Sequence, residues 1–106
     1  MTGKRCLYTS QEFTKHIIGL HPRESDMLLE FLWEHAIRSE YCVRFRWQPG
    51  SIAFWDNRAT QHQAIRDVYD TDFDRVFYRV TLNGAIPVGV DGQPSKHISG
   101  EWMAPA

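Results

Sequence analysis

The sequence has little of several features that would assign it to a specialised class of protein. It contains only two cysteines, Cys6 and Cys42, far apart and without a Cys-x-x-Cys pair. A disulfide framework or a cysteine zinc site is therefore disfavoured, and we expect two reduced, mostly buried thiols. No apolar run approaches the roughly 18 residues of a membrane span, and none follows residues 1–6 as a secretory signal would. We therefore expect a cytoplasmic protein with no membrane partner.

An excess of charge of one sign is also absent. Twelve Lys and Arg residues against thirteen Asp and Glu residues give a net charge of −1. This balance provides no general attraction to nucleic acid, so no nucleic-acid partner is expected. The fractions of hydrophobic and charged residues, 42% and 24%, are those of an ordinary globular protein. A chain of 106 residues is shorter than a typical domain and builds one small core at most.

The clearest periodic pattern predicts one helix over residues 23–38. Pro22 suits the first helical position, and the acidic residues that follow suit the positive end of a helix. Apolar side chains then recur every three or four residues and define a face that we expect to pack on a sheet. That face comprises Met27, Leu28, Phe31, Leu32 and His35, the last as a packing histidine.

From residue 41 the period changes to two, which is typical of strands. Strands are predicted over four segments: 41–47, 51–56, 60–65 and 75–82. Residues 87–106 lose this pattern and are expected to form a surface tail. The predicted class is mainly β with one helix (α+β), with an antiparallel sheet from a sandwich or barrel. A jelly roll takes eight strands, so the strand count indicates part of a larger fold.

Three polar side chains fall where the pattern predicts burial: His62, Arg75 and Arg79. The two arginines share one face of their strand because they are separated by an even number of residues. Without acidic residues on that face, they predict an anionic ligand. The alternative, two solvated arginines on an edge strand, stays open.

The run WDNRATQH at residues 55–62 carries a resemblance. It resembles the C-terminal metal-histidine segment of the taurine dioxygenase family, whose members use Fe(II) and 2-oxoglutarate. The likeness covers residues 1–94 as the C-terminal part of such a domain and leaves 95–106 as a tail. Residues 87–92 are most similar to the alkyl sulfate dioxygenase branch. The resemblance implies a partial double-stranded β-helix, the cupin-like jelly roll.

The resemblance also implies a role for each matching residue. His62 matches an iron ligand, and Arg75 matches the arginine that holds the distal carboxylate of 2-oxoglutarate. Arg79 matches the arginine that meets the sulfonate or sulfate of the substrate, and Trp55 matches an aromatic wall of the iron cavity. The implied substrate is a small sulfonate or sulfate ester such as taurine. A planar guanidinium suits paired contacts to such anions.

The sequence departs from the family at the other iron ligands. These come as His-x-Asp or His-x-Glu upstream, and none of the five histidines here begins such a motif. Asp56 is expected to be a turn residue rather than an iron carboxylate, although both readings stay open. Two functions remain: part of a dioxygenase completed by an upstream segment, or a truncated, non-catalytic fragment that at most binds an anion. The isolated chain is expected to be inactive and, with uncovered sheet surface, to form homo-oligomers.

Overall fold

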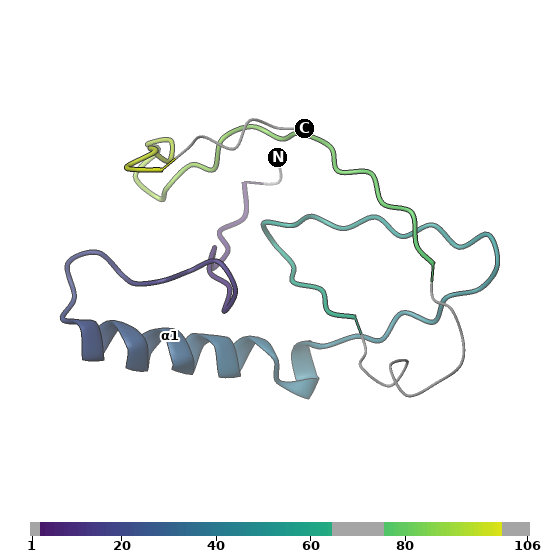
Figure 1. Ribbon diagram of the computed structural model, residues 1–106, viewed down its shortest axis with the longest axis horizontal. Helices are drawn as coiled ribbons and strands as arrows, with labels where there is room; N and C mark the ends of the chain where they lie inside the picture. The colour runs from purple at the N-terminus through teal and green to yellow at the C-terminus, as the bar shows by residue number, and fades with distance from the viewer. Residues whose placement is uncertain (1–2, 65–75, 101–106) are drawn as a thin grey trace. The chain divides into compact units, whose positions relative to one another are not determined.

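The computed structural model describes residues 3–64 and 76–100 (Figure 1). The chain divides into two compact units, Met1–Gln63 and Ala64–Ala106, and each is described by itself. The first unit contains the α-helix α1, Pro22–Ala36, and a short 3-10 helix η1, Ser39–Tyr41. The predicted helix over 23–38 is thereby confirmed to within two residues at its C-terminal end. None of the described helices is long and apolar enough to cross a bilayer.

The N-terminus of α1 is closed by a capping box. The ring of His21 accepts a hydrogen bond from the backbone N–H of Arg23, and the Glu24 carboxylate accepts one from the backbone N–H of His21, at 3.0 Å. Pro22 occupies the first turn, where its missing N–H costs nothing. These contacts satisfy N–H groups that have no partner within the helix, so the sequence around residue 21 fixes where α1 begins.

The face of α1 that is buried differs from the predicted one. Ser25 and Leu29 are buried, with 1% and 2% of their surface exposed, whereas Met27 is 70% exposed. The Ser25 hydroxyl accepts a hydrogen bond from the backbone N–H of Ile17 at 2.8 Å, which holds the preceding segment against the helix. The predicted stripe is mostly exposed because no sheet lies against it within the described residues.

Aromatic and ionic contacts surround the C-terminal end of α1. The ring of His35 lies between Phe31 and Tyr41, with centroid distances of 6.4 and 5.0 Å. His35 therefore makes packing contacts, as predicted, although its side chain remains exposed. Arg38 pairs with Glu40 at 2.8 Å, and this hydrogen bond lowers the pKa of the Glu40 carboxyl.

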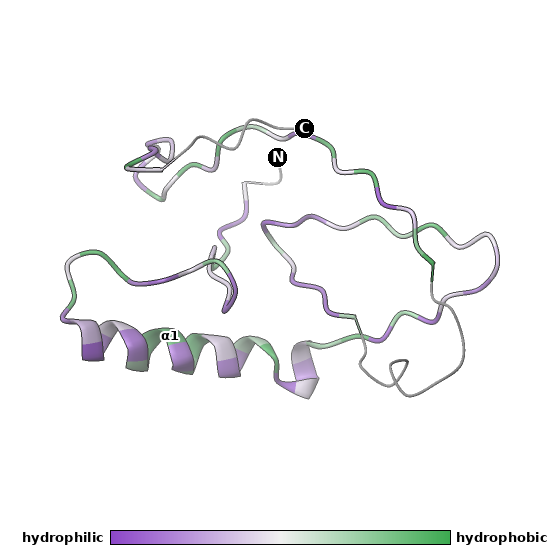
Figure 2. Ribbon diagram, in the orientation of Figure 1, coloured by the Kyte–Doolittle hydropathy of each residue, from purple (hydrophilic) through white to green (hydrophobic). Residues whose placement is uncertain are grey.

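The predicted strands are not hydrogen-bonded as strands in the described residues. Residues 42–64 and 76–87 form open segments, and the described chain has a single isolated antiparallel bridge, between Val88 and Pro94 (Figure 1). A strand requires a partner to receive its backbone hydrogen bonds, and no described segment provides one. Apolar side chains on these segments are consequently exposed, Phe54 by 90% and Tyr78 by 97%. Figure 2 shows that hydrophobic and hydrophilic residues are interspersed along the open segments.

Part of the strand periodicity is nevertheless visible. Phe45 and Trp47, two positions apart, contact each other edge to face with ring centroids 4.8 Å apart. Alternate residues of an extended backbone share one side, so this contact is what a strand predicts. The expectation of mostly buried thiols is wrong for the described structure, because Cys6 and Cys42 are both free and exposed.

The second unit contains a small hairpin that the sequence pattern did not predict. Ser95 N donates to the Pro87 carbonyl at 2.8 Å, and Gly89 N donates to the Gln93 carbonyl at 2.8 Å. Gly92 turns the chain with φ of +80°, a conformation that favours glycine. Residues 87–95 therefore form a local hairpin within the expected surface tail, and they are mostly exposed, as a surface segment should be. The part of that tail from residue 101 lies outside the described residues.

Candidate functional site

The segment that carries His62 begins with a tight turn organised by Asp56. The Asp56 carboxylate accepts a hydrogen bond from the backbone N–H of Arg58 at 2.9 Å. Its backbone carbonyl accepts from the N–H groups of Ala59 and Thr60, and also from the Thr60 hydroxyl. Asp56 thus accepts four hydrogen bonds within its own turn. The prediction that it is a turn residue is confirmed.

This turn brings two of the predicted site residues together. Trp55 precedes the turn and His62 follows it, and their ring centroids lie 4.8 Å apart with planes inclined at 46°. The indole N–H of Trp55 donates to Asn57 Oδ1 at 2.8 Å, which fixes the indole relative to the turn. His62 is exposed, so one side of its imidazole is packed against an aromatic wall while the ring remains accessible.

The two arginines belong to the second unit of the chain. Arg79 belongs to the second unit, where it is exposed on the segment that follows residue 75. Arg75 lies outside the described residues. The predicted shared face of these two side chains therefore stays a prediction.

The described donor set does not by itself fit an iron centre. Among residues 3–64 and 76–100, no group of three or more His, Cys, Asp or Glu side chains converges to hold a metal ion. A facial Fe(II) site needs two histidines and a carboxylate, and the predicted set contains one histidine, His62. The Asp56 carboxylate, the candidate nearest in sequence, accepts a hydrogen bond through Oδ1 within its own turn.

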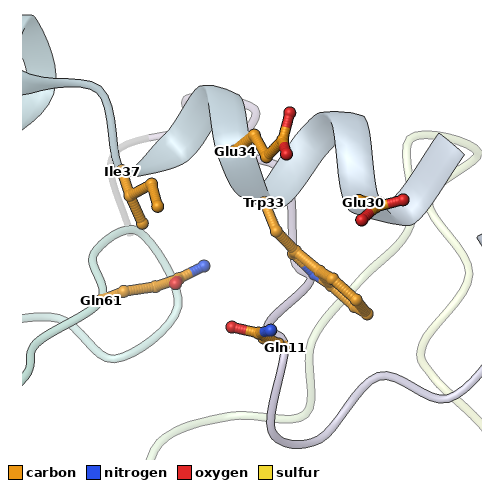
Figure 3. Close-up of a pocket in the computed structure, with 6 residues that line it drawn as sticks. All are labelled: Gln11, Glu30, Trp33, Glu34, Ile37 and Gln61. Carbon is orange, nitrogen blue, oxygen red and sulfur yellow. The ribbon is translucent and has the colours of Figure 1, made fainter. Parts of the chain in front are cut away.

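A pocket of about 160 Å³ is lined by residues of α1 and by Gln61, the residue before His62. Figure 3 shows the side chains of Trp33, Gln11 and Gln61 turned toward it. Gln61 Nε2 donates to the backbone carbonyl of Thr9 at 2.7 Å. Sequence reasoning missed these residues because no periodicity or motif links positions so distant along the chain.

Comparisons with known proteins show the family of this chain. Residues 1–81 match the family described as "Taurine catabolism dioxygenase TauD, TfdA family", and the chain belongs to that family. It is 47% identical over 96 residues to an alpha-ketoglutarate-dependent sulfate ester dioxygenase of Pseudomonas putida, covering 91% of this chain and 31% of that protein. It is 39% identical over 95 residues to an alkylsulfatase of Acinetobacter baylyi, covering 90% and 29%.

A solved structure is similar as well. The crystal structure of a taurine dioxygenase from Burkholderia xenovorans matches with a TM-score of 0.89 and 59% identity, over 94% of this chain and 36% of that one. The described residues nevertheless make no strand ladder, with one isolated bridge between Val88 and Pro94. The chain spans about a third of the length of these relatives.

Proposed function

We propose that this chain supplies one part of an Fe(II)- and 2-oxoglutarate-dependent dioxygenase that oxidises a sulfonate or a sulfate ester. The observation that carries the proposal is the Asp56 turn, which holds the His62 imidazole against Trp55 in a chain that belongs to the family. Relatives are named as dioxygenases of sulfate esters and of sulfonates that depend on alpha-ketoglutarate. The proposed fold is the corresponding part of a double-stranded β-helix.

Within this proposal each residue has one task. His62 provides one metal-binding nitrogen, and Trp55 limits the orientations of its ring. Arg75 binds the distal carboxylate of 2-oxoglutarate, and Arg79 binds the sulfonate or sulfate of the substrate. A guanidinium makes two parallel hydrogen bonds to either anion and keeps its charge at any physiological pH, which suits it to both tasks.

Metal and oxygen chemistry require donors beyond those described in this chain. With one histidine of a three-ligand site, the 106-residue chain alone is proposed to have no turnover. The runner-up function, a non-catalytic fragment that binds an anion through Arg75 and Arg79, is consistent with this same shortage of ligands. The two proposals differ in what happens when the missing ligands are restored.

A chimeric enzyme distinguishes them. This chain replaces the matched third of the Pseudomonas putida relative, which contributes the rest of the protein. We expect succinate formation from 2-oxoglutarate that depends on Fe(II) and is accompanied by sulfate release from an alkyl sulfate or sulfite release from taurine. The same chimera with His62→Ala serves as the control and should show neither. A well-folded chimera that binds sulfate but forms no succinate would favour the non-catalytic fragment.

A further inference from the structure

Two hydrogen bonds join the segment 6–9 to the segment 58–61. Cys6 Sγ donates to the Arg58 carbonyl at 3.3 Å, and Gln61 Nε2 donates to the Thr9 carbonyl at 2.7 Å. Both bonds join residues 52 positions apart in the sequence. Because residue 6 is bonded to residue 58 and residue 9 to residue 61, the residue numbers of both segments increase in the same direction. The N-terminal segment therefore lies parallel to the end of the turn that leads into His62.

Thr9 links this pair of segments to α1. The indole N–H of Trp33, which lies within α1, donates to the Thr9 hydroxyl at 3.1 Å. The backbone carbonyl of the same residue accepts the hydrogen bond from Gln61. Thr9 and Trp33 are both half-buried, so the bond between their side chains is partly protected from competition by water. The bond from Gln61 is exposed. One residue thus connects the helix, through its side chain, with the His62 segment, through its backbone.

The direction of Gln61 explains why this link concerns His62. Neighbouring residues of an extended backbone point to opposite sides. Gln61 points toward α1 and its pocket (Figure 3), while the ring of the next residue, His62, packs on Trp55. The hydrogen bond from the side-chain amide of Gln61 therefore restricts the backbone conformation at residues 61 and 62. That conformation sets the direction of the His62 side chain.

We propose that Thr9 is a positioning residue for His62, holding the Gln61 amide and α1 together so that the His62 imidazole is fixed beside Trp55. This inference rests on the proposed function, in which His62 is a metal ligand. It assigns a role to residues 9, 33 and 61 that is separate from ligand binding.

Hydrogen–deuterium exchange on the 106-residue chain tests the link without any activity. Thr9→Val keeps the shape of the side chain and removes its hydroxyl, so we expect the amides of residues 58–62 to exchange about three- to ten-fold faster. Thr9→Ser should restore the slow exchange. The control is Ser51→Ala, because the Ser51 hydroxyl accepts from the backbone N–H of Gln48 within a separate local turn. Unprotected amides in the unmodified chain, or equal effects of Thr9→Val and Ser51→Ala, would overturn the proposal.

Coupling between the two sides of Thr9 provides a second test. Trp33→Phe removes the indole donor, and Gln61→Met removes the amide donor at similar length. If Thr9 couples Trp33 to Gln61, the two substitutions should not act independently. The double variant should then accelerate exchange of the amides of residues 58–62 by clearly less than the product of the two single effects. The His62 ring protons, shifted by the nearby indole of Trp55, should move toward unshifted positions in each variant. Independent, multiplicative effects with an unmoved His62 signal would contradict the inference.

The chimeric enzyme separates this inference from the proposed function. If the unmodified chimera turns over and Thr9→Val lowers its affinity for Fe(II) at least three-fold, with recovery in Thr9→Ser, both stand. If it turns over and Thr9→Val changes neither iron affinity nor exchange at residues 58–62, the positioning role is wrong while the function holds. If it has no turnover although exchange responds to Thr9→Val, the function fails and the structural link remains.

Discussion

At the scale of single residues, Asp56 has the clearest structural role. Its carboxylate and carbonyl are both used inside the turn between Trp55 and His62. Asp56→Ala should remove the side-chain bond to Arg58 N and destabilise the turn by about 1 kcal/mol. Exchange of the Arg58 amide, measured by NMR, should accelerate accordingly.

Asp56→Asn is the matched control, because an amide oxygen accepts the same bond without the charge. It should leave the Arg58 amide protected. The Thr60 amide, which donates to the backbone carbonyl of residue 56, should respond less than that of Arg58 in either variant. If Asp56→Ala accelerates the exchange of the Arg58 and Thr60 amides by the same factor, the bond from the Asp56 carboxylate does not hold the turn.

The two arginines carry a prediction for the complete enzyme. Arg75→Ala should raise the KM for 2-oxoglutarate whatever the sulfur substrate, whereas Arg79→Ala should weaken the sulfate or sulfonate and leave uncoupled 2-oxoglutarate decay largely intact. Loss of a buried charged partner typically costs about 2–5 kcal/mol. Steady-state kinetics of the chimera measure both effects. Arg→Lys should rescue only in part, and loss of the same ligand in both variants would refute the assigned roles.

Single residues also show where sequence reasoning ends. The turn at Asp56 and the neighbouring Trp55 and His62 were predictable because they form one short, chemically unusual run. The bonds from Thr9 to Trp33 and Gln61 were not, because they join positions distant in sequence through groups that occur throughout any protein. A hydrogen bond of this kind has no compositional signature.

At the scale of elements, the helix was predictable and its buried face was not. Position and ends follow from local signals, namely the cap at His21, Pro22 and the apolar spacing. The buried face depends on what else is present to pack against it. In the described structure, the preceding segment contacts Ser25 through the backbone N–H of Ile17. Ser25 and Leu29 are buried, while the more apolar predicted stripe, which includes Met27, stays mostly exposed.

The buried face carries a prediction about stability. Ser25→Ala removes the acceptor for the Ile17 amide and leaves a partly buried N–H unpaired, which should lower the free energy of unfolding by about 1–3 kcal/mol. Denaturant titration followed by circular dichroism at the helical band measures the change. Met27→Ala, on the exposed side of α1, should change it by less than about 0.5 kcal/mol. Similar effects at both positions would mean that a different face of the helix is buried in solution.

At the scale of the whole molecule, strand positions can be predicted from alternation but their pairing cannot. Pairing needs partners, and this chain matches 36% of the similar dioxygenase structure. Val43, Phe54 and Tyr78, on the predicted strands, are exposed. The sequence therefore indicates the correct family, whereas the strand ladder that the predicted fold class requires is not formed among the described residues.

The exposed apolar side chains of the predicted strand segments, such as Val43, Phe54 and Tyr78, predict self-association of the isolated chain. Unpaired backbone groups beside apolar side chains favour contacts between copies. Light scattering after size exclusion should show a mass that grows with concentration. Val43→Lys combined with Val80→Lys should reduce the mass toward the monomer, whereas lysine at the already polar positions Gln48 and Gln93 should not. A clean monomer at high concentration would contradict the prediction.

The parallel contact between residues 6–9 and 58–61 has a consequence for the order of folding. Its two bonds each close a loop of 52 residues, and the chain-length part of that entropy cost is about 3.5 kcal/mol by (3/2)RT ln n. The capped helix α1 involves only local contacts and forms without this cost, although 15 residues are marginal alone. The nucleus of folding is therefore expected near α1, and the His62 turn docks late, with low φ-values at Cys6, Thr9 and Gln61.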